Sequence, residues 1–139
     1  MNDLEKAKSQ LQSGGYTCVL CKDDTIHTSS HRGVRPLLEL LETDVAGFYA
    51  ADKVVGRATA LLYRLLKVKA VHAQVISQGA LQVFNGSGIA VSWDSQVEYI
   101  KNRAGDGRCP MEQATQGIDD PQEALLAIQK KLKELQRGV

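Results

Sequence analysis

The sequence predicts an α/β domain in which a central mixed sheet lies between two layers of helices. Two observations lead to this prediction: a β-hairpin pattern near the N-terminus, and a later alternation of strand-length apolar runs with helical patterns. Strands that alternate with helices are typically parallel and covered on both faces, whereas a hairpin is antiparallel. Together they predict a three-layer α/β/α arrangement. The chain has 139 residues and shows no linker or internal repeat, so we expect a single domain over residues 1–139.

The first third of the chain predicts a helix, a hairpin and a second helix. Asn2 or Asp3 can cap a first helix, which ends at the Ser-Gly-Gly sequence of residues 13–15. Residues 16–22 and 25–29 are rich in β-forming side chains and flank an Asp-Asp turn, which predicts the hairpin. Pro36 is placed where a first helical turn tolerates proline, so residues 34–42 predict a short helix over the hairpin.

The middle of the chain predicts alternating helices and strands. Residues 52–66 carry the strongest apolar stripe at helical spacing, which predicts a central helix. Residues 71–76 form a strand-length apolar run, and Ser77 can cap a helix that ends at the Asn-Gly pair of residues 85–86. Residues 89–93 form a second such strand. Asp94 and Ser95 are suited to cap a further helix through residue 102.

The C-terminal third predicts a polar loop and two helices. Cys109 and Pro110 begin a short helix that ends near Gly117. Residues 121–137 predict a last helix with a narrow apolar seam, formed by Leu125, Ile128, Leu132 and Leu135. A narrow seam is suited either to the protein's own core or to a partner helix. Because strand residues 71–76 and 89–93 are also apolar and one of them can lie near a sheet edge, we expect a homo-oligomer.

Composition and charge argue against several functional classes. The chain has 17 Lys and Arg against 16 Asp and Glu, a net charge of +1, so we do not expect nucleic-acid binding through bulk charge. No apolar run approaches the roughly 20 residues that span a bilayer, and the N-terminus lacks the apolar core of a signal peptide. We therefore expect a cytoplasmic protein without membrane association. Three cysteines, an odd number, argue against a secreted disulfide framework.

Cys18 and Cys21, followed by His27 and His31, have a spacing that invites a zinc interpretation. On a strand, however, residues three positions apart point to opposite faces, so both thiols can reach one ion only if the strand is broken there. The same geometry argues against a redox role for the pair, because such motifs act at helix N-termini. We therefore expect no metal and no cofactor.

The segments before two predicted helices contain candidate ligand-binding residues. Arg32 and Gly33 precede the helix at 34–42, and helix N-termini together with Arg side chains bind anions. The alternative is a solvated loop. Asp52 and Lys53 stand at the start of the predicted central helix, where Asp52 can be a simple N-cap. Lys53 opposes the helix dipole at that position, so it is a candidate to bind a phosphate or to pair with Asp52 or Glu112.

Cys109 and Glu112 form the remaining candidate site. Cys109 follows Arg103 and Arg108, and a basic environment favours the reactive thiolate. Glu112 lies in the first turn of the same predicted helix, where a carboxylate suits the dipole. A nucleophilic cysteine needs a nearby base, and the alternative interpretation is a capping unit that closes a loop.

Four stretches of the sequence resemble a small, uncharacterised family of bacterial and archaeal proteins with a cytidine-deaminase-like fold. They are residues 33–38 (GVRPLL), 51–58 (ADKVVGRA), 76–77 (IS) and 109–112 (CPME), and the similarity runs from about residue 16 to 116. The resemblance implies that fold and a pocket between helix N-termini, without a settled activity. Zinc deaminases carry H-x-E or C-x-E at one of these helix starts and P-C-x-x-C at the next. Here the corresponding residues 52–54 and 77–80 contain neither His nor Cys, so the resemblance implies no zinc deamination.

Two functional hypotheses follow for a pocket where residues 52–53, Ser77 and residues 109–112 converge. The first is a binding protein that holds a nucleotide-like or other anionic small molecule; its candidate ligand-binding residues are Arg32, Gly33, Lys53, Ser77, Gly79 and Arg103. The second is a non-zinc enzyme that acts on a nucleotide-like substrate; its candidate catalytic residues are Asp52, Lys53, Cys109 and Glu112. A perturbed pKa in a closed pocket would favour the enzyme, and an open basic groove would favour binding.

Overall fold

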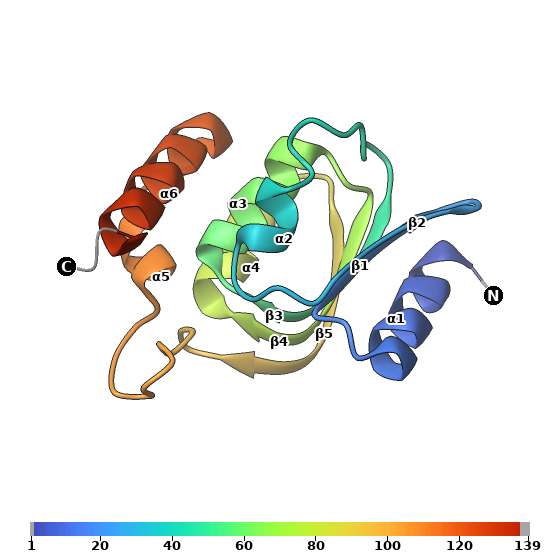
Figure 1. Cartoon of the computed structure of the whole chain (residues 1–139), viewed down its shortest axis with the longest axis horizontal. Coiled ribbons are helices and arrows are strands. Elements are labelled where there is room, and N and C mark those ends of the chain that lie inside the picture. The colour runs from blue at the N-terminus through green and yellow to red at the C-terminus, as the bar shows by residue number, and fades with distance from the viewer. Residues whose placement is uncertain (1, 137–139) are drawn as a thin grey trace.

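The structure is a computed structural model that describes residues 2–136. Its centre is an open five-stranded sheet, whose arrangement is shown in Figure 1. The strands are β1 (Cys18–Lys22), β2 (Thr25–Ser29), β3 (Tyr49–Val55), β4 (Ala70–Ser77) and β5 (Ala90–Val97). Their order across the sheet is β2-β1-β3-β4-β5. Strand β1 is antiparallel to β2 and to β3, whereas β3, β4 and β5 are mutually parallel. The predicted α/β class with a mixed sheet is confirmed.

Helices cover both faces of this sheet. They are α1 (Asp3–Gly14), α2 (Arg35–Leu38), α3 (Arg57–Leu66), α4 (Gln78–Phe84), α5 (Pro110–Ala114) and α6 (Pro121–Gln136). Helix α1 packs on β1 and β3 from one side, and α3 lies on the other side with α2 and α4 (Figure 1). The predicted cap of the first helix is confirmed, because the Asn2 side chain accepts a hydrogen bond from the backbone N of Glu5 at 2.8 Å.

The prediction of one helix over residues 52–66 is wrong at its N-terminal end. Residues 49–55 form β3, and the helix begins only at Arg57. Strand β3 is bonded on both sides, to β1 and to β4, and these long-range ladders outweigh a local helical pattern. Gly56, with extended backbone angles, separates the strand from the helix. Asp52 and Lys53 therefore lie on a strand and not at a helix N-terminus.

The prediction of a helix over residues 94–102 is also wrong. Strand β5 continues to Val97 because β4 pairs with it along its whole length, from Ala70 opposite Ala90 to Ser77 opposite Val97. Asp94 and Ser95 are strand residues of this pairing and cap no helix. As an edge strand β5 is mostly exposed and polar, which is typical of edges that resist unwanted pairing.

The main core lies between the sheet and α3, and a smaller core lies under α1. Ten-residue α3 is buried on nearly every side, because it contacts α2, α4, α5 and α6 as well as the sheet. Helix α6 packs on α3 through Ala124 and Ile128, which are fully buried. Of the other seam residues, Leu125 and Leu132 are partly buried against the core, whereas Leu135 is 46% exposed. Residue 137, the predicted end of this helix, lies outside the described residues. Between residues 2 and 136, no helix has the length and hydrophobicity needed to cross a membrane.

Candidate functional site

Two helices begin at the edge of the sheet where the parallel strands β3 and β4 end. Gly56 leads into α3, and the Ser77 side chain caps α4 by accepting a hydrogen bond from the backbone N of Ala80 at 3.1 Å. The predicted cap at Ser77 is confirmed. Gly79 lies next to α3, since a Cβ added to it would stand 3.5 Å from Cβ of Arg57. Ligands of open α/β sheets commonly bind at this carboxyl edge.

Glu112 supplies the cap of α3 from another part of the chain. Its Oε2 accepts a hydrogen bond from the backbone N of Arg57 at 3.1 Å, 55 residues away. The other oxygen, Oε1, is buried without a hydrogen-bond partner among residues 2–136. A Cβ at position 56 would collide with this oxygen, so a glycine is required for Glu112 to lie this close to the backbone. The carboxylate of Glu112 thus occupies the place at the α3 N-terminus that an external anion would take.

Arg57 has a structural role beside this cap. Its guanidinium donates hydrogen bonds to the carbonyl oxygens of Thr115 at 3.0 Å and Ile118 at 2.6 Å, and it bonds the Asp119 carboxylate at 2.6 Å. These bonds hold the connection between α5 and α6 against α3. The Arg57 side chain is only 12% exposed, and its charge is paired with Asp119 within the protein.

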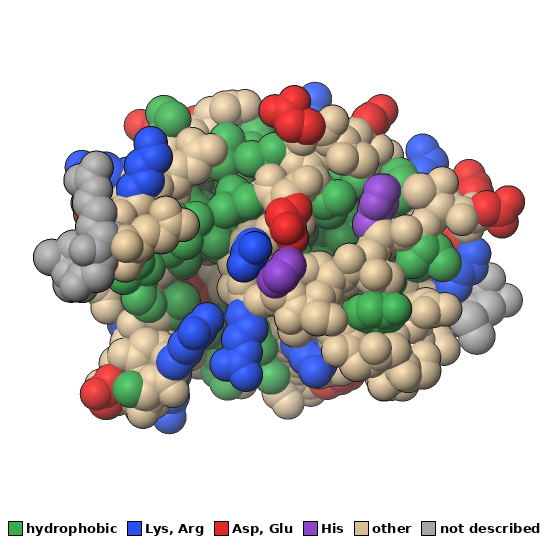
Figure 2. All heavy atoms as spheres, in the orientation of Figure 1, with side chains coloured by type: hydrophobic (Ala, Val, Ile, Leu, Met, Phe, Trp, Pro, Cys, Tyr) green, Lys and Arg blue, Asp and Glu red, His purple; other side chains and the backbone are tan. Residues whose placement is uncertain are grey.

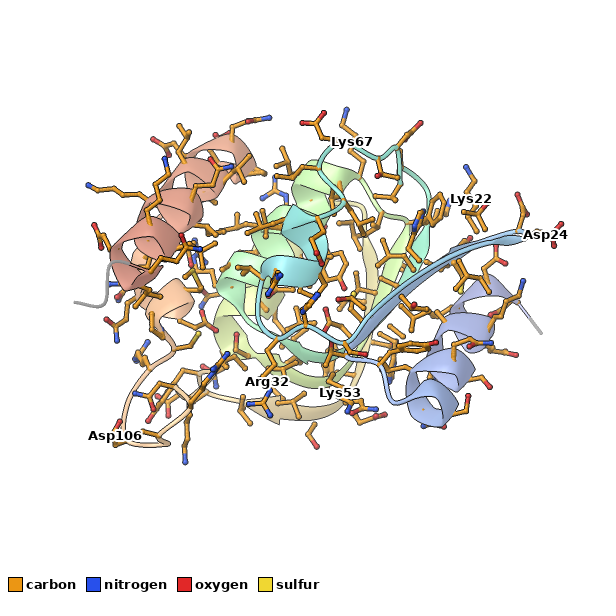
Figure 3. All side chains as sticks on the ribbon, viewed as in Figure 1. Lys22, Asp24, Arg32, Lys53, Lys67 and Asp106 are labelled. Atoms are coloured by element: carbon orange, nitrogen blue, oxygen red, sulfur yellow. The ribbon has the colours of Figure 1, made fainter. Side chains whose placement is uncertain are left out.

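An open crevice of about 590 Å³ lies where the parallel strands end. Val54, Val75 and Val97, one from each of β3, β4 and β5, form its apolar part, and Tyr99 and Lys101 from the following segment complete it together with Glu98 and Ile100. The guanidinium carbon of Arg108 lies 4.8 Å from the centre of the Tyr99 ring, a cation–π arrangement. Figure 2 shows Lys and Arg side chains gathered along the lower side of the molecule, where Figure 3 labels Arg32 and Lys53.

Asp52 and Lys53, adjacent in the sequence, lie in opposite environments. Asp52 is buried, 7% exposed, on the face of β3 that α3 covers, whereas Lys53 is exposed. Figure 3 shows Lys53 at the lower border of the view, with Arg32 of the β2–α2 connection also labelled there. Glu112 bonds the start of α3, so the predicted pairing of Lys53 with Glu112 does not occur in the structure.

Asp52 belongs to a buried polar cluster with Tyr63 of α3 and Cys18 of β1. The Tyr63 hydroxyl donates to Oδ2 of Asp52 at 2.7 Å, and Sγ of Cys18 lies 3.4 Å from the same hydroxyl oxygen. Burial raises the pKa of Asp52 to about 7, although the hydrogen bond from Tyr63 lowers it. Burial also raises the pKa of Cys18 well above its ordinary value, with a further contribution from the nearby Asp52 charge.

Cys18 opens onto a second cleft, of about 220 Å³, between the β1–β2 hairpin and α2. Its apolar lining is Leu20, Ile26, Pro36 and Leu40, and its polar lining is His27, Thr28, Ser29 and Glu39. Tyr63, which contacts both other members of the buried cluster, is not among the residues predicted from the sequence. The available signal was a tyrosine with a polar tip inside an otherwise apolar helical stripe.

The remaining predicted site residues do not meet in one place. Arg32 is exposed, and Gly33 turns the chain into α2 with a φ of 67°. Arg103 lies in an exposed loop that is held by hydrogen bonds from the backbone N of Gly105 and Asp106 to Asn102. Cys109, half-buried, precedes Pro110 at the start of α5 and makes no side-chain cap there.

The two cysteines of β1 point to opposite faces, as predicted. Cys18 belongs to the core on the α3 side, and Cys21 belongs to the core on the α1 side. Within residues 2–136 there is no group of three or more His, Cys, Asp and Glu side chains that could hold a metal ion. The absence of a bound metal or cofactor stays a prediction.

The His72 side chain on β4 contacts two residues of the edge strand β5. Its Nδ1 lies 2.7 Å from Oγ of Ser92, and its Nε2 lies 3.2 Å from Oδ1 of Asp94, both on β5. Burial lowers the pKa of His72, and Lys8 lowers it further. Because both ring nitrogens are engaged and no described cleft adjoins them, this cluster serves the pairing of β4 with β5.

Comparison with known proteins agrees with this architecture. Residues 6–132 match the family described as TM1506, domain of unknown function (DUF1893). This chain belongs to the DUF1893 family. A crystal structure of a DUF1893 family protein, TM1506 from Thermotoga maritima, matches with a TM-score of 0.87 and 29% sequence identity, covering 94% of this chain and 90% of that one. No curated protein matches this DUF1893 chain.

Proposed function

We propose that this DUF1893 protein binds a nucleotide-like or other anionic small molecule, without zinc, on a cytidine-deaminase-like fold. The observation that carries the proposal is the open crevice of about 590 Å³ at the carboxyl ends of β3, β4 and β5. This is the place where open sheets with parallel strands commonly bind ligands. We place the ligand in this crevice and not in the narrower space between the helix N-termini, because Glu112 already caps α3 there.

The chemistry of the crevice suits a ligand with a planar part and a negative charge. Tyr99 offers an aromatic ring beside the valine side chains, and a nucleobase can stack on such a ring. Lys101 lines the same crevice, and Arg108 stands over Tyr99. Their positive charges favour phosphate, while Glu98 at the border provides one acceptor for a sugar or base donor.

Binding is a better account of this crevice than the enzyme predicted from Asp52, Lys53, Cys109 and Glu112. Asp52 is buried under α3, Lys53 is exposed, Glu112 caps α3 and Cys109 begins α5. A set of residues so distributed does not supply a nucleophile with an adjacent base. Homo-oligomerisation and a cytoplasmic location remain predictions of the sequence.

The experiment is isothermal titration calorimetry with adenosine diphosphate, adenosine and inorganic phosphate as separate titrants. We expect adenosine diphosphate to bind and Lys101→Met to weaken its binding by about tenfold, the loss of one charge-assisted contact. Lys130→Met is the matched control, because Lys130 is an exposed lysine of α6 outside the crevice. No heat from any titrant at millimolar concentration, or equal weakening by both lysine changes, would contradict the proposal. Elemental analysis of the same sample tests the expectation that no zinc is bound.

A further inference from the structure

The second cleft, between the β1–β2 hairpin and α2, has a buried polar cluster at its base. We propose that it is a reaction site for a small, uncharged electrophile, in which Cys18 is the nucleophile and the Tyr63–Asp52 pair accepts its proton. This site shares no lining residue with the crevice of the proposed function, so the two proposals are independent.

The sheet register places the reacting groups in one row. Cys18 stands opposite Ser29 of β2 on one side and opposite Asp52 of β3 on the other. Directly opposed residues of antiparallel strands project to the same face, so all three side chains share the side of the sheet that faces α2 and α3. Ser29 and Cys18 line the cleft, whereas Asp52 lies behind Cys18. The row therefore runs from the cleft into the core.

When Asp52 is ionised, the hydrogen bonds in the cluster have a defined direction. A tyrosine hydroxyl carries one hydrogen, and that hydrogen is donated to Oδ2 of Asp52 at 2.7 Å. The contact of 3.4 Å between Sγ of Cys18 and the Tyr63 oxygen is then a thiol that donates to the hydroxyl. Each donor already points along the path that a proton would follow from sulfur to carboxylate.

The proposed step balances within these groups. The sulfur of Cys18 forms a bond to an electrophilic carbon, and the leaving group departs with its bonding electrons. The thiol proton moves to the Tyr63 oxygen while the Tyr63 proton moves to the carboxylate of Asp52. The products are a thioether or thioester at Cys18, a neutral Tyr63, a protonated Asp52 and the free leaving group. No redox change is involved.

The surroundings of the cluster select the substrate class. The charged or titratable side chains that face it are Asp52 from β3, His27 from β2 and Glu39 from α2, besides Tyr63 and Cys18 themselves. Two carboxyl groups disfavour an anionic electrophile, while the apolar lining and the hydroxyl of Ser29 suit a small, neutral, polar one. A cleft of about 220 Å³ limits the size of the molecule.

Alkylation by iodoacetamide, mapped by mass spectrometry of the cysteine peptides, tests the proposal. Cys21 is the internal control, because it lies on the same strand and is as deeply buried but faces α1 on the other side. We expect Cys18 to react about 100-fold faster than Cys21, the usual gain from a positioned base. Tyr63→Phe and Asp52→Asn should each remove this gain without altering the rate at Cys109. Equal rates at Cys18 and Cys21, or unchanged rates at Cys18 in both variants, would overturn the proposal.

The pH dependence of the unaltered protein gives a test that needs no variant. If Asp52 is the base, the rate at Cys18 rises with pH and levels off above about 7, where Asp52 is ionised. Cys21 has no such base, so its rate keeps rising as its own thiol ionises. The anionic reagent iodoacetate should also react more slowly than iodoacetamide at Cys18. A rate at Cys18 that continues to rise in parallel with that at Cys21 would refute the role of Asp52.

Discussion

The buried carboxyl group of Asp52 makes the stability of the fold depend on pH in a direction opposite to most carboxyl groups. In the folded protein, burial raises its pKa from 3.8 to about 7. Between these two values the folded state holds a proton that the unfolded state has lost. The contribution of Asp52 to the free energy of unfolding is therefore most favourable below about pH 4, falls as the pH rises toward 7, and is constant above that. At about 1.4 kcal/mol for each pH unit, the carboxyl group costs about 4 kcal/mol of stability at pH 8.

Asp52→Asn removes this titration while keeping the size of the side chain and an oxygen that can accept from Tyr63. We expect urea unfolding to show that the wild-type protein loses about 4 kcal/mol more than the variant between pH 4 and pH 8. Other groups such as His72, whose pKa is lowered by burial, titrate in both proteins, so their contributions cancel in the comparison. Any lost hydrogen bond of the variant is independent of pH and also cancels.

The matched control is Asp24→Asn at the tip of the hairpin, an exposed carboxylate that Figure 3 shows at the border of the molecule. We expect this control to keep the pH dependence of the wild-type protein. If Asp52→Asn and the wild-type protein have the same pH dependence within about 1 kcal/mol, Asp52 is ionised in the fold at ordinary pH and its pKa is not raised by burial.

Four further predictions concern the rest of the structure. Gly56→Ala should destabilise the protein by about 1–3 kcal/mol in thermal unfolding, because its Cβ collides with Glu112; a neutral effect would mean that the α5 segment moves freely. Lys53→Met should change stability by less than about 0.5 kcal/mol, since Lys53 is exposed, and a strong loss would reveal an unrecognised ion pair. Ile128→Ala should cost about 2–5 kcal/mol, whereas Leu126→Ala, at a position 68% exposed, should cost little; equal losses would argue against the packing of α6 on α3. Light scattering should report a homo-oligomer, and a monomer at tens of micromolar, a rough upper range for such contacts, would contradict it.

The overall class of the fold could be predicted because its signals are local. The hairpin, the Asn2 cap and the Ser77 cap each depend on residues close together in the sequence, and all three are present. The failures occurred where a long-range ladder decides between two local patterns. Val54 and Val55 fit the start of a helical stripe as well as a strand. Pairing of β3 with β1 and β4 favours the strand.

The candidate site could be predicted only in part, because its contacts join segments far apart in the chain. Glu112 was identified as a dipole-compatible carboxylate, but the helix that it caps begins 55 residues earlier. The crevice needs the carboxyl ends of three strands together with Tyr99, and the expected helix over 94–102 shortened the predicted strand at 89–93 and so removed Val97 from that edge. The Tyr63 hydroxyl reaches Asp52 only because residues 52 and 63 lie on a strand and on the helix packed over it.

The change from helix to strand at Asp52 also decides its chemistry. As the N-cap of the predicted central helix, Asp52 would accept amide hydrogen bonds, remain ionised and act beside Lys53. On β3, successive side chains alternate between faces, so burial takes Asp52 into the core and leaves Lys53 exposed. The sequence pair Asp-Lys is thereby split into a carboxyl group that titrates near neutrality and an exposed cation. The groups that the sheet and α3 bring to Asp52, and with which it can exchange a proton, are therefore Cys18 and Tyr63.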